Sequence, residues 1–518
     1  MRPLSDLVTA LLGTALLSAF TWMVLKPTVG FDDANITQNY AQNIARGLGY
    51  VFYEGGERVE GSTSALWTAM NVVGYLITDT PEELFAGMGF AFTAAMILFT
   101  ILIARSLLRM AGIEGGPVAL IVAAFFALIP ALYAWSVWSL METGLWNAAA
   151  AGFLWAGVRF IEERSRTGGQ GPVTALVLFA VLMVLIRPEG VALVAGGAAA
   201  LLVIDRALLS HRTAGAPIGA AIAALAAFGA LTFARLIYFG VPHPNTYYAK
   251  VSTDLKSELV LGWDYTWTYL NQPEHMVLGL FALLGVIAIL RLPGTAERPG
   301  LWAVTLFFAT VMLGTFAVYT VLGGDHFGSH RYYQVFLILT IPAGTLGILA
   351  LGSVRALPRA TLALGGLIAI GLQWSIFSIT KGHLEIEFRL PERQRPAGAI
   401  LNQLADRPTI GLYIAGGIPM TFDGVIYDMF GLNWTEMAHA ERHDRWLQGG
   451  FSKDVFMSVT PDIVTPMNDE CEMAWPEDHW INVALEQIYR DPDFLALYEL
   501  DCWQGVSFFR HKDYQGIP

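Results

Sequence analysis

Two adjacent carboxylates, Asp32 and Asp33, follow the first apolar segment of the chain. Adjacent acids repel one another unless a cation or a proton lies nearby. Such a pair can supply a general base toward an acceptor hydroxyl, or ligands for a divalent cation. The alternative is a solvated cap, with Asp33 capping a helix over residues 35–46. The dipeptide alone does not decide between these interpretations.

Five basic side chains also lie in the polar segments beside or between apolar segments: Arg46, Arg235, Lys250, His326 and Arg331. Cationic donors of this kind suit a phosphate anion. We therefore predict that they bind the phosphate of a substrate. The alternative is that their charged ends reach lipid headgroups from apolar surroundings.

Further polar and aromatic residues of the same segments are candidates for substrate binding. They are Asn35, Glu60, Trp67, Glu142, Arg187, Glu189, His243, Asn245, Tyr247, Tyr248 and Asp325. Arg187 and Glu189 could instead form only a turn with an ion pair, and the prolines on both sides of His243 could fix a surface turn. Tyr247 and Tyr248 also fit an aromatic belt at a membrane interface.

The chain carries no strong cofactor motif. Asp325 beside His326 offers a metal ligand or a base, but no spacing marks a zinc site. A divalent cation (Mg, Mn or Ca) is left open, and no other cofactor is predicted. There is no Walker A loop, Rossmann fingerprint or nucleophile elbow.

The composition places these residues in a membrane protein. Of the 518 residues 55% are hydrophobic and only 14% are charged, with a mean hydropathy of +0.51. Soluble domains carry about 25% charged residues, so an ordinary cytosolic enzyme is excluded. Two cysteines exclude a disulfide-rich fold, and the absence of a basic stripe argues against nucleic acid as a partner.

Apolar stretches of about 20 residues are long enough to cross a bilayer. We predict about eleven spans, near residues 7–26, 84–104, 117–134, 144–160, 172–187, 190–204, 216–239, 276–291, 300–321, 331–351 and 360–379. The first is not a cleavable signal, because no small-residue cleavage site follows it. The apolar stretch 65–77 is short, so we interpret it as interfacial or re-entrant.

Basic residues predict the orientation. With the N-terminus inside, every cytoplasmic loop carries arginine, as the positive-inside rule requires. The candidate site residues then fall on the outer side, in the long first outer loop (about 27–83) and in later outer loops. Charged groups at membrane depth are costly and usually functional, so chemistry at the outer face is expected.

The chain divides into a transmembrane body (1–384) and a periplasmic α/β domain (385–518). The second part holds 22 acidic and 10 basic residues and so accounts for the whole net charge of -12. Strand-like runs at 410–415, 424–427 and 462–464 alternate with helical patterns such as 481–489. Cys471 and Cys502 could pair in an oxidising periplasm. Asp423 and Asp428 are candidates for acceptor binding, with buried or turn-forming roles favoured.

Several motifs, in order, resemble a known family. The run FDDANITQNYAQNIARGLGYVFYEGGERVEGSTSALWT is similar to the first outer loop of the terminal arabinofuranosyltransferases of the actinobacterial cell wall. The blocks SLMET, IRPEG, ARLIYFGVPHPNTYYAK, GGDHFGSHRYY, VIYDMFGLNW and PDIV continue the resemblance over nearly the whole chain.

The resemblance implies a GT-C glycosyltransferase with an active site at the outer face of the bacterial inner membrane. Its donor would be a polyprenyl-phosphate sugar, with arabinofuranose the best single guess, and its acceptor a glycan or a protein. Asp32 and Asp33 match the acidic pair that this superfamily uses for catalysis. The smaller C-terminal region and the sequence FGSHR, in place of a methionine-proline-glycine turn, depart from the cell-wall enzymes.

Other functions stay open. The same fold could use polyprenyl-phosphate mannose or glucose. A transporter of a lipid-linked glycan is a further alternative, although transporters tend to show internal repeats and broken helices near the midplane. An assembly factor would tolerate changes at both aspartates.

Overall fold

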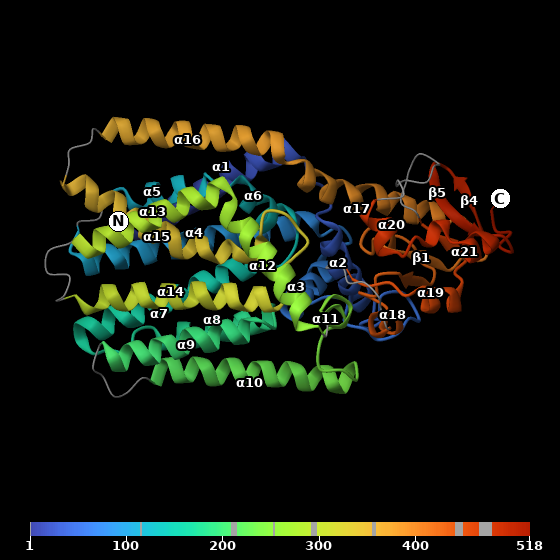
Figure 1. Ribbon diagram of the computed structural model, residues 1–518, viewed down its shortest axis with the longest axis horizontal. Coiled ribbons are helices and arrows are strands. Elements are labelled where there is room, and N and C mark those ends of the chain that lie inside the picture. Colours follow the sequence, from blue (N-terminus) through green and yellow to red (C-terminus); the bar gives the residue numbers. More distant parts are fainter. Residues whose placement is uncertain are drawn as a thin grey trace.

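The computed structural model describes residues 2–113, 116–208, 215–251, 254–291, 298–354, 359–440, 449–465 and 479–517. Long helices run along one another through most of the molecule, and a small sheet domain, formed by the C-terminal part of the chain, lies at one end (Figure 1). The N-terminus lies toward the other end. The predicted class, a helical membrane body with a small C-terminal α/β domain, is confirmed at this level.

The helices of the body share high hydropathy and little charge along their lengths. They are α1 (Arg2–Leu25), α4 (Glu82–Ala111), α5 (Val118–Phe126), α6 (Pro130–Tyr133), α7 (Thr143–Thr167), α8 (Val173–Ile186), α9 (Gly190–Ala207), α10 (Gly215–Tyr238), α13 (Pro273–Arg291), α14 (Pro299–Val321), α15 (Val335–Val354) and α16 (Arg359–Thr380).

Among the described residues, seven helices are long and apolar enough to cross a membrane, or up to nine if each of two bent pairs is one span. Helix occupies all eleven segments that the sequence predicts as spans. The number of eleven crossings stays a prediction, since α8 is short and two spans are bent.

The predicted span 117–134 is not one straight helix. It is broken after α5, whose axis makes an angle of 85° with the helical segment Pro130–Trp138. Pro130 begins α6, and proline offers no N–H to continue the preceding helix. A π-helix over Ala134–Trp138 follows, and it places the Trp135 ring 4.7 Å from the Phe31 ring, centroid to centroid.

Five further helices lie at the junction between the body and the C-terminal domain. They are α2 (Asp32–Ala45), α3 (Ala65–Ile77), α11 (Asn245–Lys250), α12 (Leu255–Asn271) and α17 (Gly382–Leu401). At ~1.5 Å per residue α3 reaches only about 20 Å, less than the bilayer core. Its length fits the interfacial or re-entrant interpretation.

The C-terminal domain contains a five-stranded sheet in the order β2-β1-β3-β5-β4. The first three strands are parallel, and β5 runs antiparallel to both of its neighbours. The strands are β1 (Ile410–Leu412), β2 (Ile426–Asp428), β3 (Ile463–Val464), β4 (Tyr498–Trp503) and β5 (Val506–His511). The short helices around them are α18 (Thr435–His439), α19 (Lys453–Val459), α20 (Trp480–Ala484) and α21 (Pro492–Leu497).

The three strands predicted from the sequence therefore correspond to β1, β2 and β3. The helix predicted over 481–489 is divided into α20 and a 3-10 turn at Ile488–Arg490. The proposed pair of Cys471 and Cys502 involves Cys471, which lies outside the described residues.

The segment predicted as the first outer loop (about 27–83) and the C-terminal domain share one hydrophobic core. Ile36, Tyr40 and Phe52 pack in the same buried cluster as Ile410 and Leu412 of β1. The predicted domain boundary at residue 385 falls inside α17, which continues from α16 after a bend of 52°. Residues far apart in the sequence thus form one folded unit at the end of the body.

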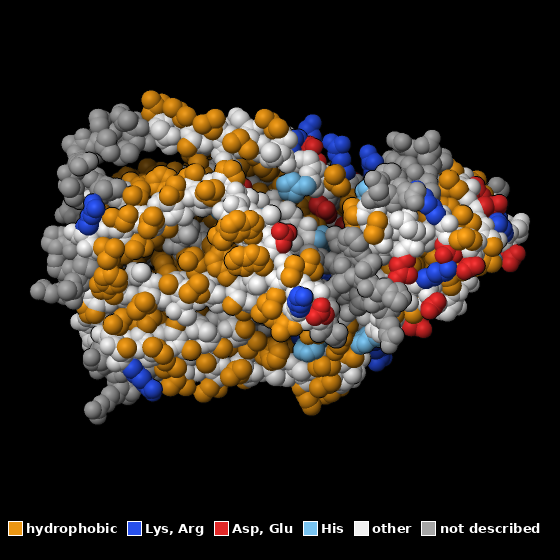
Figure 2. All heavy atoms as spheres, viewed as in Figure 1, with side chains coloured by type: hydrophobic (Ala, Val, Ile, Leu, Met, Phe, Trp, Pro, Cys, Tyr) orange, Lys and Arg blue, Asp and Glu red, His pale blue; other side chains and the backbone are white. Residues whose placement is uncertain are grey.

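The visible surface follows the same division. Figure 2 shows hydrophobic side chains over most of the helical body, whereas charged side chains gather where the body meets the C-terminal domain and on that domain itself.

Candidate active site

The adjacent acids lie in the first turn of α2, after a turn that is fixed by a close backbone contact. Gly30 has a φ of +80°, and a Cβ there would meet the Ser139 carbonyl oxygen at 2.7 Å. The Phe31 N–H donates to the same oxygen at 3.0 Å. Only glycine fits this turn. Because α2 begins at Asp32, the alternative of Asp33 as the cap of a later helix is wrong.

Asp32 is buried against the C-terminal domain. Its Oδ1 accepts the N–H groups of Gly416 and Gly417, at 3.0 and 3.3 Å. A Cβ on Gly416 would lie 2.3 Å from this oxygen, so only glycine allows the approach. Burial, and after it the charge of Asp33, raises the pKa of Asp32 from 3.8 to about 8. Asp32 therefore carries a proton at neutral pH.

Asp33 is more open, with 21% of its side chain exposed, and it faces cations. Burial acts to raise its pKa, but Lys250 and then Arg331 outweigh burial and lower the pKa below its ordinary value. The Arg331 Nη2 lies 4.0 Å from the Asp33 Oδ2. Asp33 therefore stays ionised at neutral pH, directly beside a protonated neighbour.

Arg331 is held in place by the loop before α15. Its Nε donates to the Asp325 Oδ2 at 2.6 Å, and its Nη1 to the Met141 sulfur at 3.2 Å. The guanidinium also lies over the Phe327 ring, 4.7 Å from its centroid. These contacts orient the positive charge beside Asp33 with little freedom to move.

His326 belongs to the same group, but as a neutral side chain. Its Nδ1 lies 3.4 Å from the Asp325 Oδ1. Burial lowers the pKa of His326 to about 4 despite this carboxylate. At neutral pH His326 can offer a hydrogen bond but no charge.

Arg235 and Arg187, like Arg331, are paired with acids. Arg235 donates to both carboxylate oxygens of Glu60, at 2.7 and 2.9 Å, and both side chains are buried. Arg187 pairs with Glu142 and, at 2.5 Å, with Glu189. The ion pair that the sequence offered as the alternative for Arg187 and Glu189 is present.

Arg46 lies away from the acidic pair. It is the C-cap of α2, about 20 Å along the helix from Asp32 at ~1.5 Å per residue. There it lines a separate cavity of about 340 Å³, together with Asn39, Asn43 and Asp423. The structure thus gathers Lys250, Arg331 and His326 around Asp33 but does not bring Arg46 to them.

Asn35 and Trp67 connect parts of the chain. The Asn35 amide donates to the Phe31 carbonyl at 2.7 Å, and its Oδ1 accepts from the Arg395 Nε at 2.7 Å. The Trp67 Nε1 donates to the Leu140 carbonyl at 3.1 Å. Both side chains are buried, so they hold the turn around Asp32 and Asp33 in position.

The segment from His243 to Lys250 docks on the C-terminal domain. The Asn245 amide donates to the carbonyls of Gly431 and Leu432, at 2.8 and 3.1 Å. The Tyr248 ring lies 4.4 Å from the His439 ring, and the Tyr247 ring lies 4.7 Å from the His243 ring. Since α11 ends at Lys250, these contacts help to position the Lys250 charge.

Two features of the site are missing from the sequence predictions. Glu387 of α17 is a third acid here, because burial, and after it Asp33 and Asp32, raises its pKa to about 8. No pattern marks this residue in the sequence. The Gly416–Gly417 loop had a visible signal, a glycine pair directly after a predicted strand.

The tail acids have structural roles. Asp428 is fully buried and accepts from the N–H groups of Phe430 and Asn433, at 3.0 and 2.9 Å. Burial raises its pKa to about 6. Asp423 is exposed and its N–H donates to Asn402 at 2.9 Å. For Asp428 the favoured buried, turn-forming role is confirmed.

The described residues contain no group of three or more His, Cys, Asp or Glu side chains that could hold a metal ion. The arrangement instead offers an ionised carboxylate, a protonated one and fixed cations within one junction. No model of a known protein family matches the chain, and a search of curated proteins finds no similar sequence.

Proposed function

We propose that this protein is a membrane glycosyltransferase. It moves a sugar, with arabinofuranose as the first candidate, from a polyprenyl-phosphate donor to a glycan or protein acceptor at the outer face of the bacterial inner membrane. The observation that carries the proposal is the pair Asp32 and Asp33, held in opposite protonation states with Arg331 4.0 Å from Asp33.

The reaction needs a base for the acceptor. The acceptor hydroxyl gives its proton to the ionised Asp33 carboxylate, and its oxygen attacks C1 of the donor sugar. The bond between C1 and the phosphate oxygen breaks, and its electron pair stays on the polyprenyl phosphate. Asp33 is suited to the base role because it is ionised and partly exposed.

The leaving phosphate needs positive charge. Arg331 and Lys250 act on Asp33 electrostatically, so a donor phosphate beside Asp33 would lie in the same positive field. His326 can add a neutral hydrogen bond. A carboxylate next to the sugar also stabilises the positive charge that develops on its ring.

The outer location is supported by the distribution of basic residues. Helices α4, α7, α9 and α13 each carry arginine in the last turn, and these turns precede the loops that we assign to the cytoplasm. The acidic pair and the C-terminal domain then face the periplasm. A donor there has to arrive on a lipid, because no nucleotide sugars are expected outside the membrane.

Transfer by the purified protein in nanodiscs tests the proposal. The protein is offered polyprenyl-phosphate arabinofuranose, mannose or glucose with short glycan acceptors, and release of polyprenyl phosphate is followed. We expect release with one donor, and none from the double variant Asp32→Asn/Asp33→Asn. Equal release by the wild type and the double variant would falsify the mechanism.

The alternatives give different results in the same assay. Release only with mannose or glucose would keep the fold and the mechanism and change the sugar. Failure to release or bind any of the three donors would favour transport or assembly.

A further inference from the structure

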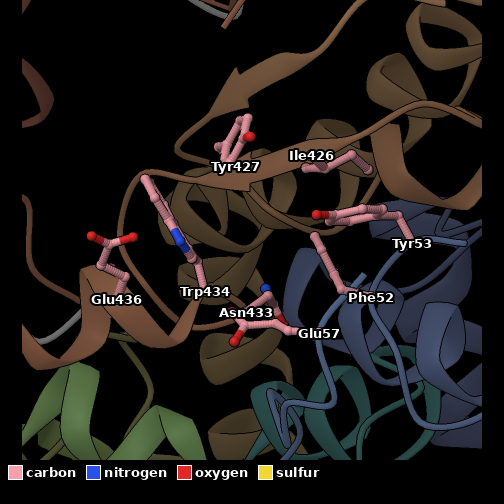
Figure 3. A pocket seen from close by; sticks show the side chains of 8 residues that line it. All are labelled: Phe52, Tyr53, Glu57, Ile426, Tyr427, Asn433, Trp434 and Glu436. Atoms are coloured by element: carbon pink, nitrogen blue, oxygen red, sulfur yellow. The ribbon is translucent and has the colours of Figure 1, made fainter. Parts of the chain in front are cut away.

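Besides the cavity beside Arg46, another cavity lies between the first outer loop and the C-terminal domain. Neither Asp32 nor Asp33 lines it. Its volume is about 190 Å³. A water molecule occupies about 30 Å³ in the liquid, so the space fits a small organic group. Figure 3 shows its lining: Tyr53 and Glu57 come from the outer loop, and Tyr427, Asn433, Trp434 and Glu436 from β2 and the segment around α18.

Aromatic rings line this cavity on several sides. The centroids of the Tyr427 and Trp434 rings are 5.0 Å apart, and their planes form an angle of 56°. Tyr53 lies on another side of the same space (Figure 3). Tyr53, Tyr427 and Glu57 line the same cavity. Burial, and then Tyr427 and Glu57, raises the pKa of the Tyr53 hydroxyl. The pocket therefore presents ring surfaces from both parts of the chain.

The charged side chains that line the pocket are acidic. Glu57 and Glu436 line it, and among the residues that the structure describes no lysine or arginine does. In the part of the chain that the structure describes, neither carboxylate is paired with a basic side chain. Glu57 has a fixed position, because its Oε1 accepts the Thr435 N–H at 2.7 Å.

Asn433 anchors the base of the pocket. Its backbone N–H and its amide both donate to the Asp428 Oδ2, at 2.9 and 2.8 Å. Its Oδ1 accepts the Tyr40 hydroxyl at 3.0 Å. The segment that carries Trp434 is thus tied to the first outer loop, and the pocket is preformed.

Aromatic faces attract the same kind of ligand as carboxylates that pair with no basic side chain in the described part of the chain. The face of an aromatic ring carries partial negative charge and binds cations, above all quaternary ammonium groups. A neutral sugar would use the rings and the amide but would leave both carboxylates uncompensated. We propose that this pocket binds an organic ammonium group, supplied by a quaternary amine or by an amino sugar. The proposal does not rest on the transferase activity.

The test measures binding to the full-length protein in nanodiscs whose lipids carry no amine. Choline is the quaternary probe and glucosamine the amino-sugar probe, and titration calorimetry or saturation-transfer NMR gives the affinities. The neutral controls are 3,3-dimethylbutan-1-ol, which has the shape of choline without its charge, and glucose. We expect one ammonium probe to bind at least about tenfold more tightly than its neutral counterpart, since a cation–π contact contributes about 1–2 kcal/mol.

Two variants assign the binding to this pocket. Trp434→Ala removes one wall, and Glu57→Gln/Glu436→Gln removes the charge while glutamine can still accept the Thr435 N–H. Each should weaken binding at least about tenfold, whereas Glu83→Gln, an exposed glutamate of α4, should leave it unchanged.

Three results would overturn the proposal. They are equal affinity for an ammonium probe and its neutral counterpart, unchanged affinity in the charge variant, and no binding of either probe. Because Glu436 is exposed, Glu436→Gln alone keeps the test valid if the tryptophan variant does not fold.

Discussion

Among the described residues, buried acids with an arginine partner occur at both ends of the helical body, for example Asp205 with Arg164 at one end and Glu60 with Arg235 at the other. Only at the end that meets the C-terminal domain is there also a buried acid, Asp32, without an arginine partner. At the end near the N-terminus, Asp6 pairs with Arg105 at 2.5 Å and Asp205 with Arg164 at 3.1 Å. At the other end, Asp32 accepts only backbone N–H groups from the C-terminal domain, and no basic side chain described in the structure lies within ion-pair distance of it.

The difference distinguishes acids that stabilise the fold from acids that can take part in a reaction. A buried acid with its own arginine keeps the body together, and removing one partner leaves the other uncompensated. Crowded acids with shifted pKa values are the pattern of functional sites. Asp32, Asp33 and Glu387 follow that second pattern, because their pKa values are moved in opposite directions within one junction.

The largest effect is expected at Asp33. Asp33→Asn removes the ionised base, and loss of a general base costs roughly 10²- to 10⁴-fold in rate. The measurement is the initial rate of polyprenyl-phosphate release with the accepted donor. Asp454→Asn, on the exposed side of α19, is the matched control and should be unaffected. A wild-type rate of the Asp33→Asn variant would contradict the role of Asp33 as the general base.

The two ion pairs near the N-terminus should affect stability instead of chemistry. Arg164→Ala leaves the fully buried Asp205 without its partner, which should cost about 3–5 kcal/mol of unfolding free energy. Thermal unfolding in detergent measures this loss, and the rate per folded molecule at low temperature should stay unchanged. The double variant Arg164→Ala/Asp205→Ala should recover part of the stability. A lowered transfer rate of the folded Arg164→Ala protein would contradict a purely structural role for this ion pair.

The sequence predicts the helical body better than the contacts at the end that meets the C-terminal domain. Helix positions follow from apolar length, a local property, and helix is present at every predicted span. Asp32, Asp33, Lys250 and Arg331 are identified because each stands in a polar segment next to an apolar one. The break before Pro130 also has a local cause in proline itself, although the sequence analysis treats 117–134 as one span.

Long-range contacts could not be predicted. The hydrogen bond from Gly416 to Asp32 joins positions 384 residues apart. The ion pair of Arg235 and Glu60 joins positions 175 residues apart. The sequence analysis predicts Arg235 as a phosphate-binding residue and does not predict this partner. Glu387 is a single acid in a polar helix, so only the docking of α17 makes it part of the site.

The stability of the end that meets the C-terminal domain should also depend on pH. Since the pKa of Asp32 is raised from 3.8 to about 8, its stabilising contribution is complete below pH 4 and is lost as the pH rises to about 8. The loss is about 1.4 kcal/mol for each pH unit in this window. Asp32→Asn keeps an oxygen for the glycine N–H groups and cannot ionise, so unfolding between pH 6 and 8 should depend less on pH. Glu387→Gln should act in the same direction, and an unchanged pH dependence in Asp32→Asn would show that Asp32 ionises without cost.

The smallest effect is expected at the contact that joins the two regions of the site. In Gly416→Ala the new Cβ would lie 2.2 Å from the Asp32 carbonyl oxygen and 2.3 Å from its Oδ1, so the loop has to move away. Overpacking of this kind costs about 1–3 kcal/mol. Burial raises the pKa of Asp32 by more than the Gly416 and Gly417 N–H groups lower it. A loop that moves away should therefore lower this pKa, and the pH dependence of unfolding should shift to lower pH. Gly87→Ala, on α4 with open space around it, is the control and should change neither property. If Gly416→Ala unfolds like the wild type at every pH, the C-terminal domain does not set the protonation of Asp32, and the acidic pair has to be explained by the helical body alone.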